Sequence, residues 1–153
     1  MLKNKKGIAY IYVCVIVIFM ASLLSVTILY IGLTAQVQIQ KRDVQKKLDS
    51  YVSYYATESY NAIKQGNRYN DHMDYDAFSN GIYRSLGFAG DTADVYEYDN
   101  AGCAMTRPEV TVLKGDGFGL TLRYTAIFPI TWNGHSYSDL EVPVMVSSYY
   151  KFK

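Results

Sequence analysis

The feature that most constrains this chain is an uncharged, mostly apolar run from Ile8 to Ala35. As an α-helix, its 28 residues would be about 42 Å long, against about 30 Å for the hydrocarbon core of a bilayer. A secretory signal has a shorter apolar region, of about 7 to 15 residues, and a small-x-small cleavage site that Leu33-Thr34-Ala35 matches poorly. We therefore expect a membrane-spanning helix.

Charges on the two sides of the run do not decide its orientation. The basic residues nearly balance: Lys3, Lys5 and Lys6 precede the run, and Lys41, Arg42, Lys46 and Lys47 follow it. Membrane proteins usually place more Lys and Arg on the cytoplasmic side, so this balance leaves the topology open.

The helical pattern continues beyond the apolar run. A heptad-like stripe spaced by 7, 4, 3, 4 and 7 residues is formed by Val37, Val44, Leu48, Tyr51, Tyr55 and Ala62. Gly66 then provides a helix stop, and no proline precedes Pro108. The sequence thus predicts one helix from about Ile8 to Gln65, apolar in its first half and amphipathic in its second.

After this helix, the period of the hydrophobic pattern changes. A short helix is predicted from Asp74, a suitable N-cap, to Gly87, a suitable C-terminal stop. Alternation with period two then indicates about four strands, near residues 95–98, 109–113, 120–130 and 140–146. The pair Asn133-Gly134 favours a two-residue hairpin turn, and Pro143 indicates an edge or bulged strand.

The predicted fold class is α+β, with a long N-terminal helix and a small antiparallel β-sheet head. Four segments follow from the pattern: a basic leader over residues 1–7, a transmembrane helix over 8–35, an amphipathic stem helix over 36–66, and a small α+β head over 67–153. In a chain of 153 residues, the part outside the apolar run is enough for one compact head.

The head is acidic, which argues against nucleic acid as a partner. Residues 67–150 contain five Lys and Arg against eleven Asp and Glu, a net charge of about −6. Asp71, Asp74 and Asp76 cluster beside His72, and two alternatives stay open for them: helix capping with solvation, or cation binding without an EF-hand spacing. We favour capping, so the sequence predicts no metal site.

No residue pattern for catalysis or a cofactor emerges. His72 and His135 lack a neighbouring serine or cysteine motif, and Cys103 has no histidine or lysine close by in sequence. The segment Gly115 to Gly119 lacks the Lys-Ser/Thr of a phosphate-binding loop and is interpreted as a turn between strands. Cys14 lies within the apolar run, so a spanning chain could not pair it with Cys103. We expect a protein that is not an enzyme and that binds no cofactor.

The opening of the chain resembles that of a known family. A short basic leader ends in glycine, and the segment from Lys6 to Val13 reads KGIAYIYV. Together with the apolar half-helix, the amphipathic half-helix and the β-rich head, this resembles type IV pilins and pseudopilins. In length and composition the chain is most similar to the TadE-like minor pilins of tight-adherence systems, and its start is similar to a pilin-like group from Gram-positive bacteria.

The resemblance implies a processing site and exposes one departure. A prepilin peptidase would cut after Gly7 and leave Ile8 as the new N-terminus. The acidic residue of the family, five places after the cut, would fall on Tyr12, which is not acidic. A tyrosine can accept one hydrogen bond from a terminal ammonium but cannot neutralise its charge. Either the chain is cut and serves as a tip or non-polymerising subunit, or it stays an uncut anchor with Tyr10 and Tyr12 in an aromatic belt.

By this resemblance, the function is that of a pilin-like structural subunit, a minor pilin or pseudopilin of a surface filament or secretion apparatus. The implied partners are the membrane, other pilin-like subunits through the N-terminal helix, and a prepilin peptidase. The implied location is the cell membrane, with one span, an extracytoplasmic head and assembly into a surface filament. The alternative is a single-pass membrane-anchored binding or sensory module with an extracellular head.

Overall fold

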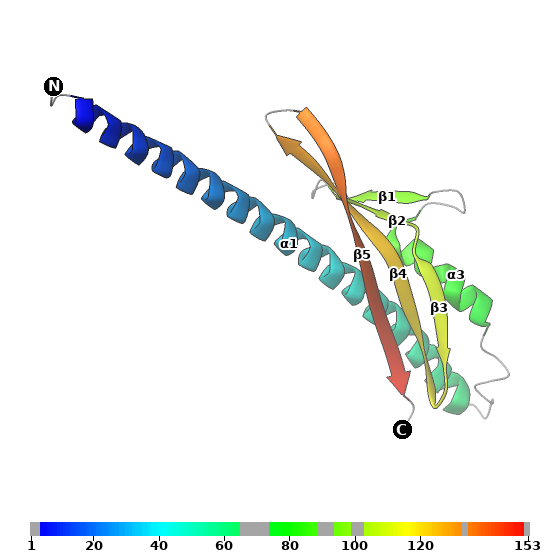
Figure 1. Ribbon diagram of the computed structural model, residues 1–153. Coiled ribbons are helices and arrows are strands. Elements are labelled where there is room, and N and C mark those ends of the chain that lie inside the picture. Colours follow the sequence, from blue (N-terminus) through cyan, green and yellow to red (C-terminus); the bar gives the residue numbers. More distant parts are fainter. Residues whose placement is uncertain (1–3, 65–73, 89–93, 99–102, 133–134, 152–153) are drawn as a thin grey trace. The chain divides into compact units, whose positions relative to one another are not determined.

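The computed structural model describes residues 4–64, 74–88, 94–98, 103–132 and 135–151. Contacts divide the chain into two units, Met1–Gln36 and Val37–Lys153, and each is described by itself. The architecture is α+β, with a long N-terminal helix and an antiparallel sheet, as the sequence predicts (Figure 1).

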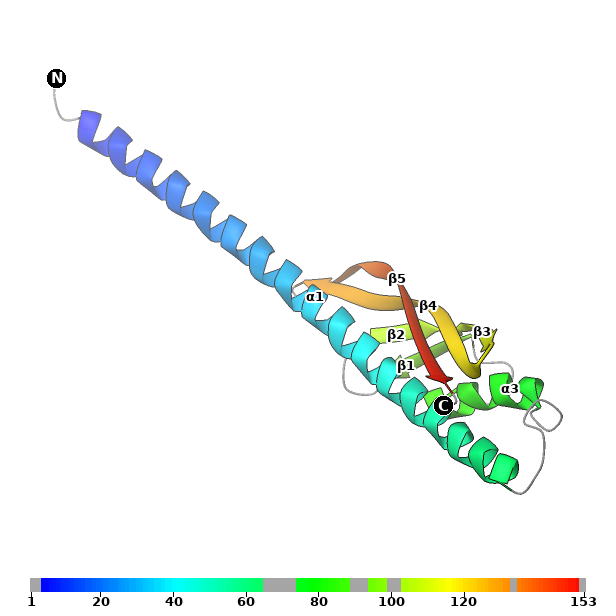
Figure 2. The same ribbon diagram turned by 90° about the horizontal axis from the view of Figure 1, so that it is seen from below.

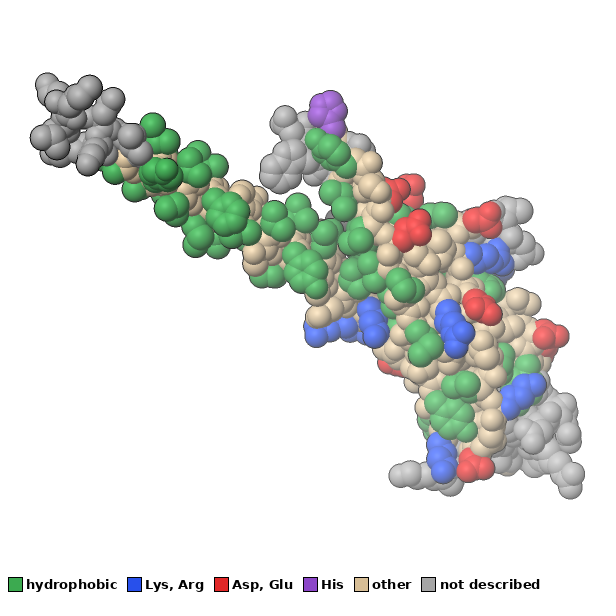
Figure 3. Space-filling view, viewed as in Figure 1, with side chains coloured by type: hydrophobic (Ala, Val, Ile, Leu, Met, Phe, Trp, Pro, Cys, Tyr) green, Lys and Arg blue, Asp and Glu red, His purple; other side chains and the backbone are tan. Residues whose placement is uncertain are grey.

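Helix α1 runs without interruption from Asn4 to Lys64, over 61 residues. This continuity confirms the prediction of a single helix across the apolar and amphipathic halves. In the first unit most of the large apolar side chains are exposed, and Figure 3 shows apolar side chains along the visible side of this part of the helix. The expected stop at Gly66 lies outside the described residues.

Helix α3, Tyr75–Leu86, has both of the predicted caps. The side chain of Asp74 accepts hydrogen bonds from the backbone N–H groups of Asp76, at 3.0 Å, and Ala77, at 2.9 Å. At the other end Gly87 has φ = 104°, a left-handed conformation that glycine adopts without a Cβ penalty. The N–H of Phe88 then bonds to the carbonyl of Tyr83 at 3.0 Å, which completes a Schellman motif.

The sheet has five strands rather than the expected four. They are β1 (Val95–Tyr98), β2 (Cys103–Thr106), β3 (Glu109–Lys114), β4 (Gly117–Trp132) and β5 (His135–Lys151), and every described pairing is antiparallel. The long strand β4 pairs with β5 on one side and with both β2 and β3 on the other, and β1 pairs with β2. The missed strand is β2, which begins with three apolar residues, Cys103, Ala104 and Met105, and so shows no alternation of apolar and polar side chains.

A bulge separates β2 from β3 along the same side of β4. Glu109 is four residues after Met105, but their partners on β4, Arg123 and Ala126, are only three residues apart. The hydroxyl of Thr106 accepts the N–H of Thr125 at 2.9 Å and so replaces a missing backbone partner.

One face of the sheet is buried beneath helices. Figures 1 and 2 show α3 and the second half of α1 on the same face. Alternate residues of β4 supply the core of this layer: Phe118, Leu120, Leu122, Tyr124, Ala126 and Phe128. From β5 they are joined by Val144 and Val146. This alternation is the period-two pattern that the sequence predicts.

The buried row of α1 differs in part from the predicted stripe. Val44 and Leu48 are fully buried as expected, and Tyr51 and Tyr55 are half-buried. The row continues at steps of four, however, through Gln40, Val52 and Ala56, which the heptad-like stripe omitted. Side chains spaced by four residues form a row that is inclined to the helix axis by about 26°. A helix that crosses a sheet at an angle buries such an inclined row, whereas a heptad stripe runs nearly parallel to the axis. The side chain of Ala62 lies outside the described residues.

Strand β5 forms one edge of the sheet, as Pro143 predicts. The carbonyl of Ser147 accepts a hydrogen bond from the side-chain amide of Gln45, at 3.0 Å, so it points away from β4. Because outward and inward positions alternate along an antiparallel strand, Pro143 also occupies an outward position. Its missing N–H therefore costs no ladder bond, and it interrupts the free edge of β5.

Candidate functional site

The predicted processing site lies at the start of α1. Gly7 and Ile8 are both within the helix, whose described part begins at Asn4. Tyr12, where the resemblance places an acidic residue, is 66 % exposed within the first unit. The apolar run from Ile8 to Ala35 contains no acidic residue at any other position either. The ammonium group of a processed N-terminus could therefore contact only neutral side chains in this run.

The apolar half of α1 has the properties of a membrane span. Within the described ranges, it lies in the one helix that is long and apolar enough to cross a bilayer. Two of its hydroxyls bond to carbonyls of the same helix: Ser22 to Phe19 at 2.9 Å, and Thr27 to Leu23 at 2.8 Å. Internal satisfaction of polar groups is what a hydrocarbon environment requires.

The acidic cluster acts in part as a helix cap. Asp74 caps α3, whereas Asp71 and His72 lie outside the described residues. Among the residues that the structure describes, no group of three His, Cys, Asp or Glu side chains could hold a metal ion.

Cys103 of β2 is buried on the covered face of the sheet and is not placed for nucleophilic chemistry. Burial raises the pKa of its thiol, which keeps it protonated at neutral pH. Nearby, burial also raises the pKa of the Tyr124 hydroxyl, with smaller contributions from Cys103 and Asp43. These groups therefore behave as neutral core residues.

The predicted turn between β3 and β4 consists of Gly115 and Asp116 alone, whereas Gly117, Phe118 and Gly119 belong to β4. The glycines of β4 permit close approach of the neighbouring strand. A Cβ on Gly117 would lie 2.9 Å from the Cα of Lys151, and one on Gly119 would lie 2.8 Å from the Cα of Tyr149. Packing of β4 against β5 thus explains these two glycines without a phosphate ligand. His135, the other candidate from the sequence, is exposed at the start of β5.

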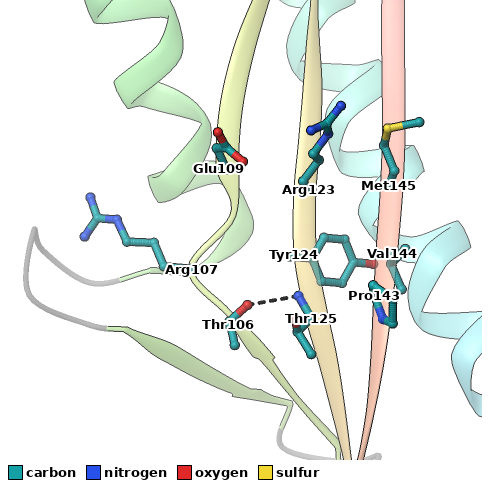
Figure 4. A pocket seen from close by; sticks show the side chains of 9 residues that line it. All are labelled: Thr106, Arg107, Glu109, Arg123, Tyr124, Thr125, Pro143, Val144 and Met145. Atoms are coloured by element: carbon teal, nitrogen blue, oxygen red, sulfur yellow. Dashed lines mark hydrogen bonds between the residues drawn. The ribbon is translucent and has the colours of Figure 1, made fainter.

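A groove of about 350 Å³ opens on the exposed face of the sheet, at the bulge between β2 and β3 (Figure 4). Its floor is crossed by β4. It is lined by Thr106, Arg107, Glu109, Arg123, Tyr124, Thr125, Pro143, Val144 and Met145.

Three side chains from adjacent strands form a row across this groove. Glu109 of β3 pairs in register with Arg123 of β4, which pairs with Met145 of β5. Figure 4 shows the Glu109 and Arg123 side chains extending beside each other, and no ion pair joins them among the described residues. Arg107, farther along the wall, lies over the ring of Tyr83 at 4.3 Å.

The groove offers several groups that could bind a ligand. It presents one carboxylate, an exposed guanidinium, two threonine hydroxyls and the apolar surface of Pro143 and Met145. Its lining contains neither histidine nor cysteine. Sequence reasoning missed the groove because it depends on the register of three strands, which no local motif encodes.

Comparisons with protein families, with curated proteins and with solved structures find no match for this chain.

Proposed function

We propose that the protein is a pilin-like structural subunit, a minor pilin or pseudopilin of a surface filament or secretion apparatus. One observation carries the proposal. The same uninterrupted helix, α1, supplies the apolar span in its first half and core residues beneath the sheet in its second. A stem that is continuous with the core of its head is the architecture that the pilin resemblance implies.

Bonds between α1 and the sheet make the second half of this helix part of the head. In the second unit the side-chain amide of Gln45 reaches the carbonyl of Ser147 at 3.0 Å, and that of Gln40 reaches Ala104 at 3.4 Å. Val44, which lies between these two glutamines, and Leu48, which follows them, are fully buried. A membrane anchor joined to its head by a flexible linker would need none of these contacts.

The proposed role is structural rather than catalytic. Cys103 is buried and protonated, and the groove is lined by neither histidine nor cysteine. The cluster around Asp74 serves in part as a helix cap. Tyr12 in place of the family acid favours a tip, initiating or minor subunit, because the pairing that joins successive stems is missing.

The second candidate is a membrane-anchored binding module, and the groove at Arg123 is the observation that favours it. In that role the head would bind a ligand at the cell surface, and the stem would remain in the bilayer.

Shearing of cells that express the full chain separates the two functions. A pilin-like subunit is expected in the sheared surface fraction, together with other filament subunits. Its amount there should fall to background in Gly7→Val, which blocks processing, and should be unchanged in Arg123→Ala. Complete retention in the membrane, with no effect of Gly7→Val, would instead support the anchored binding module.

A further inference from the structure

The apolar half of α1 contains three exposed tyrosines. Tyr10, Tyr12 and Tyr30 expose 72 %, 66 % and 69 % of their surface within the first unit. Tyr12 and Tyr30 are separated by eighteen positions, or about five helical turns, so they lie on the same face of the helix. At about 1.5 Å per residue, their Cα atoms are about 27 Å apart.

This separation is close to the hydrocarbon thickness of a bilayer, about 30 Å. Side chains on a helix lean toward its N-terminus, so both hydroxyls shift in the same direction and their separation is preserved. Residues 13–29 between them carry no charge. Tyrosine favours the membrane interface because its ring is apolar while its hydroxyl bonds to polar groups.

We infer that Tyr12 and Tyr30 lie at the two opposite interfaces of the bilayer and fix which part of the apolar run spans it. Their partners are lipid headgroup and glycerol-ester oxygens, to which each hydroxyl can donate a hydrogen bond. The inference rests on the membrane insertion contained in the proposed function, but it does not require processing or filament assembly.

The inference selects one position for a run that is longer than the bilayer. The run exceeds the hydrocarbon core by about 12 Å, so a span displaced toward the stem, from Ile16 to Ala35, would also be free of charge. The tyrosine pair places the centre of the bilayer near Ala21. It also gives Tyr12 a role of its own at the position where a pilin has its acid.

Depth measurements with single tryptophans distinguish these two positions. The chain has one tryptophan, so Tyr12→Trp, Phe19→Trp and Tyr30→Trp are each made with Trp132→Phe. Each full-length variant is reconstituted into phosphatidylcholine vesicles whose acyl chains are brominated at a shallow or a deep carbon. Aromatic replacements preserve the size and character of each side chain.

The inference predicts tryptophans at positions 12 and 30 about 13 to 15 Å from the bilayer centre, and at position 19 about 3 Å from it. A span from Ile16 to Ala35 would instead place position 30 about 7 Å from the centre and position 19 about 10 Å from it. Stronger quenching of position 30 than of position 19 by deep bromines would therefore overturn the inference alone. Protein that fails to float with the vesicles would refute membrane insertion as well.

Discussion

Tyr51 of α1 donates a hydrogen bond from its hydroxyl to the backbone carbonyl of Phe78 in α3, at 2.8 Å. Their rings also stack, with centroids 5.6 Å apart and planes 14° from parallel. Phe78 in turn meets Phe118 of β4 edge to face, with centroids 5.3 Å apart. Two helices and the sheet are thus joined through one aromatic cluster.

Gly81 lies directly against this cluster. Whether Gly81→Ala raises or lowers the free energy of unfolding therefore tests the contact. Alanine in place of glycine inside a helix normally stabilises by about 1 kcal/mol. Here a Cβ would lie 3.2 Å from Cζ of Tyr51 and nearer still to its hydroxyl. We expect Gly81→Ala to lower the free energy of unfolding by about 1 to 2 kcal/mol, because Tyr51 must move and lose its bond to Phe78.

Urea unfolding of the full chain in detergent micelles, followed by near-UV circular dichroism, measures this change. In a Tyr51→Phe background the hydroxyl is absent, so Gly81→Ala should be close to neutral or stabilising. Equal effects of Gly81→Ala in the two backgrounds would show that Tyr51 does not contact this part of α3.

Alkaline pH should destabilise the second unit through Tyr124. Burial raises the pKa of Tyr124 above its ordinary value near 10, so the folded state retains a proton that the unfolded state loses. Stability from this group is fully present below pH 10 and falls as pH rises toward the folded pKa, by about 1.4 kcal/mol per pH unit.

The variant Tyr124→Phe should reduce the alkaline fall in the free energy of unfolding, as measured by urea titrations between pH 9 and 11. Part of the fall should remain, because burial also raises the pKa of Tyr51. At pH 7 it should cost little or should stabilise, because the Tyr124 hydroxyl is buried with no hydrogen-bond partner among the described residues. If the free energy of unfolding falls equally steeply with pH in the variant and in the original chain, the burial of this hydroxyl is contradicted.

Pro143 should protect the free edge of β5 from pairing with other chains. We expect Pro143→Val to supply an outward N–H and to promote association, seen as larger particles by light scattering in detergent micelles. Met145→Val is the matched control, since it raises β-propensity at the next outward position but leaves the proline in place. If both variants stay as dispersed as the original chain, Pro143 has no such role.

The sequence predicted those parts of the fold that depend on local chemistry. The caps of α3 at Asp74 and Gly87 and the alternation along β4 are confirmed, because each follows from a few adjacent residues. Burial of Gln40 and Ala56 was missed, since it depends on the angle at which α1 crosses the sheet. For the same reason, the groove between β3, β4 and β5 left no signal in any single segment.

Tyr12 offers a test of why the family acid matters. If the chain joins a filament weakly because its stem lacks a carboxylate, Tyr12→Glu should increase its amount in the sheared surface fraction. A glutamate near the membrane interface, where a charge costs less than at the bilayer centre, should still permit insertion. Tyr12→Phe is the control and should cause no increase. A fall with Tyr12→Glu would indicate that the tyrosine itself is required.

The most direct test of the pilin-like assignment is the intact mass and N-terminal sequence of the mature chain from native membranes. Processing predicts a chain that begins at Ile8 and has lost Lys3, Lys5 and Lys6, while Gly7→Val keeps the leader. An original chain that retains its basic leader, with its head exposed at the cell surface, would contradict the account and identify α1 as an ordinary anchor.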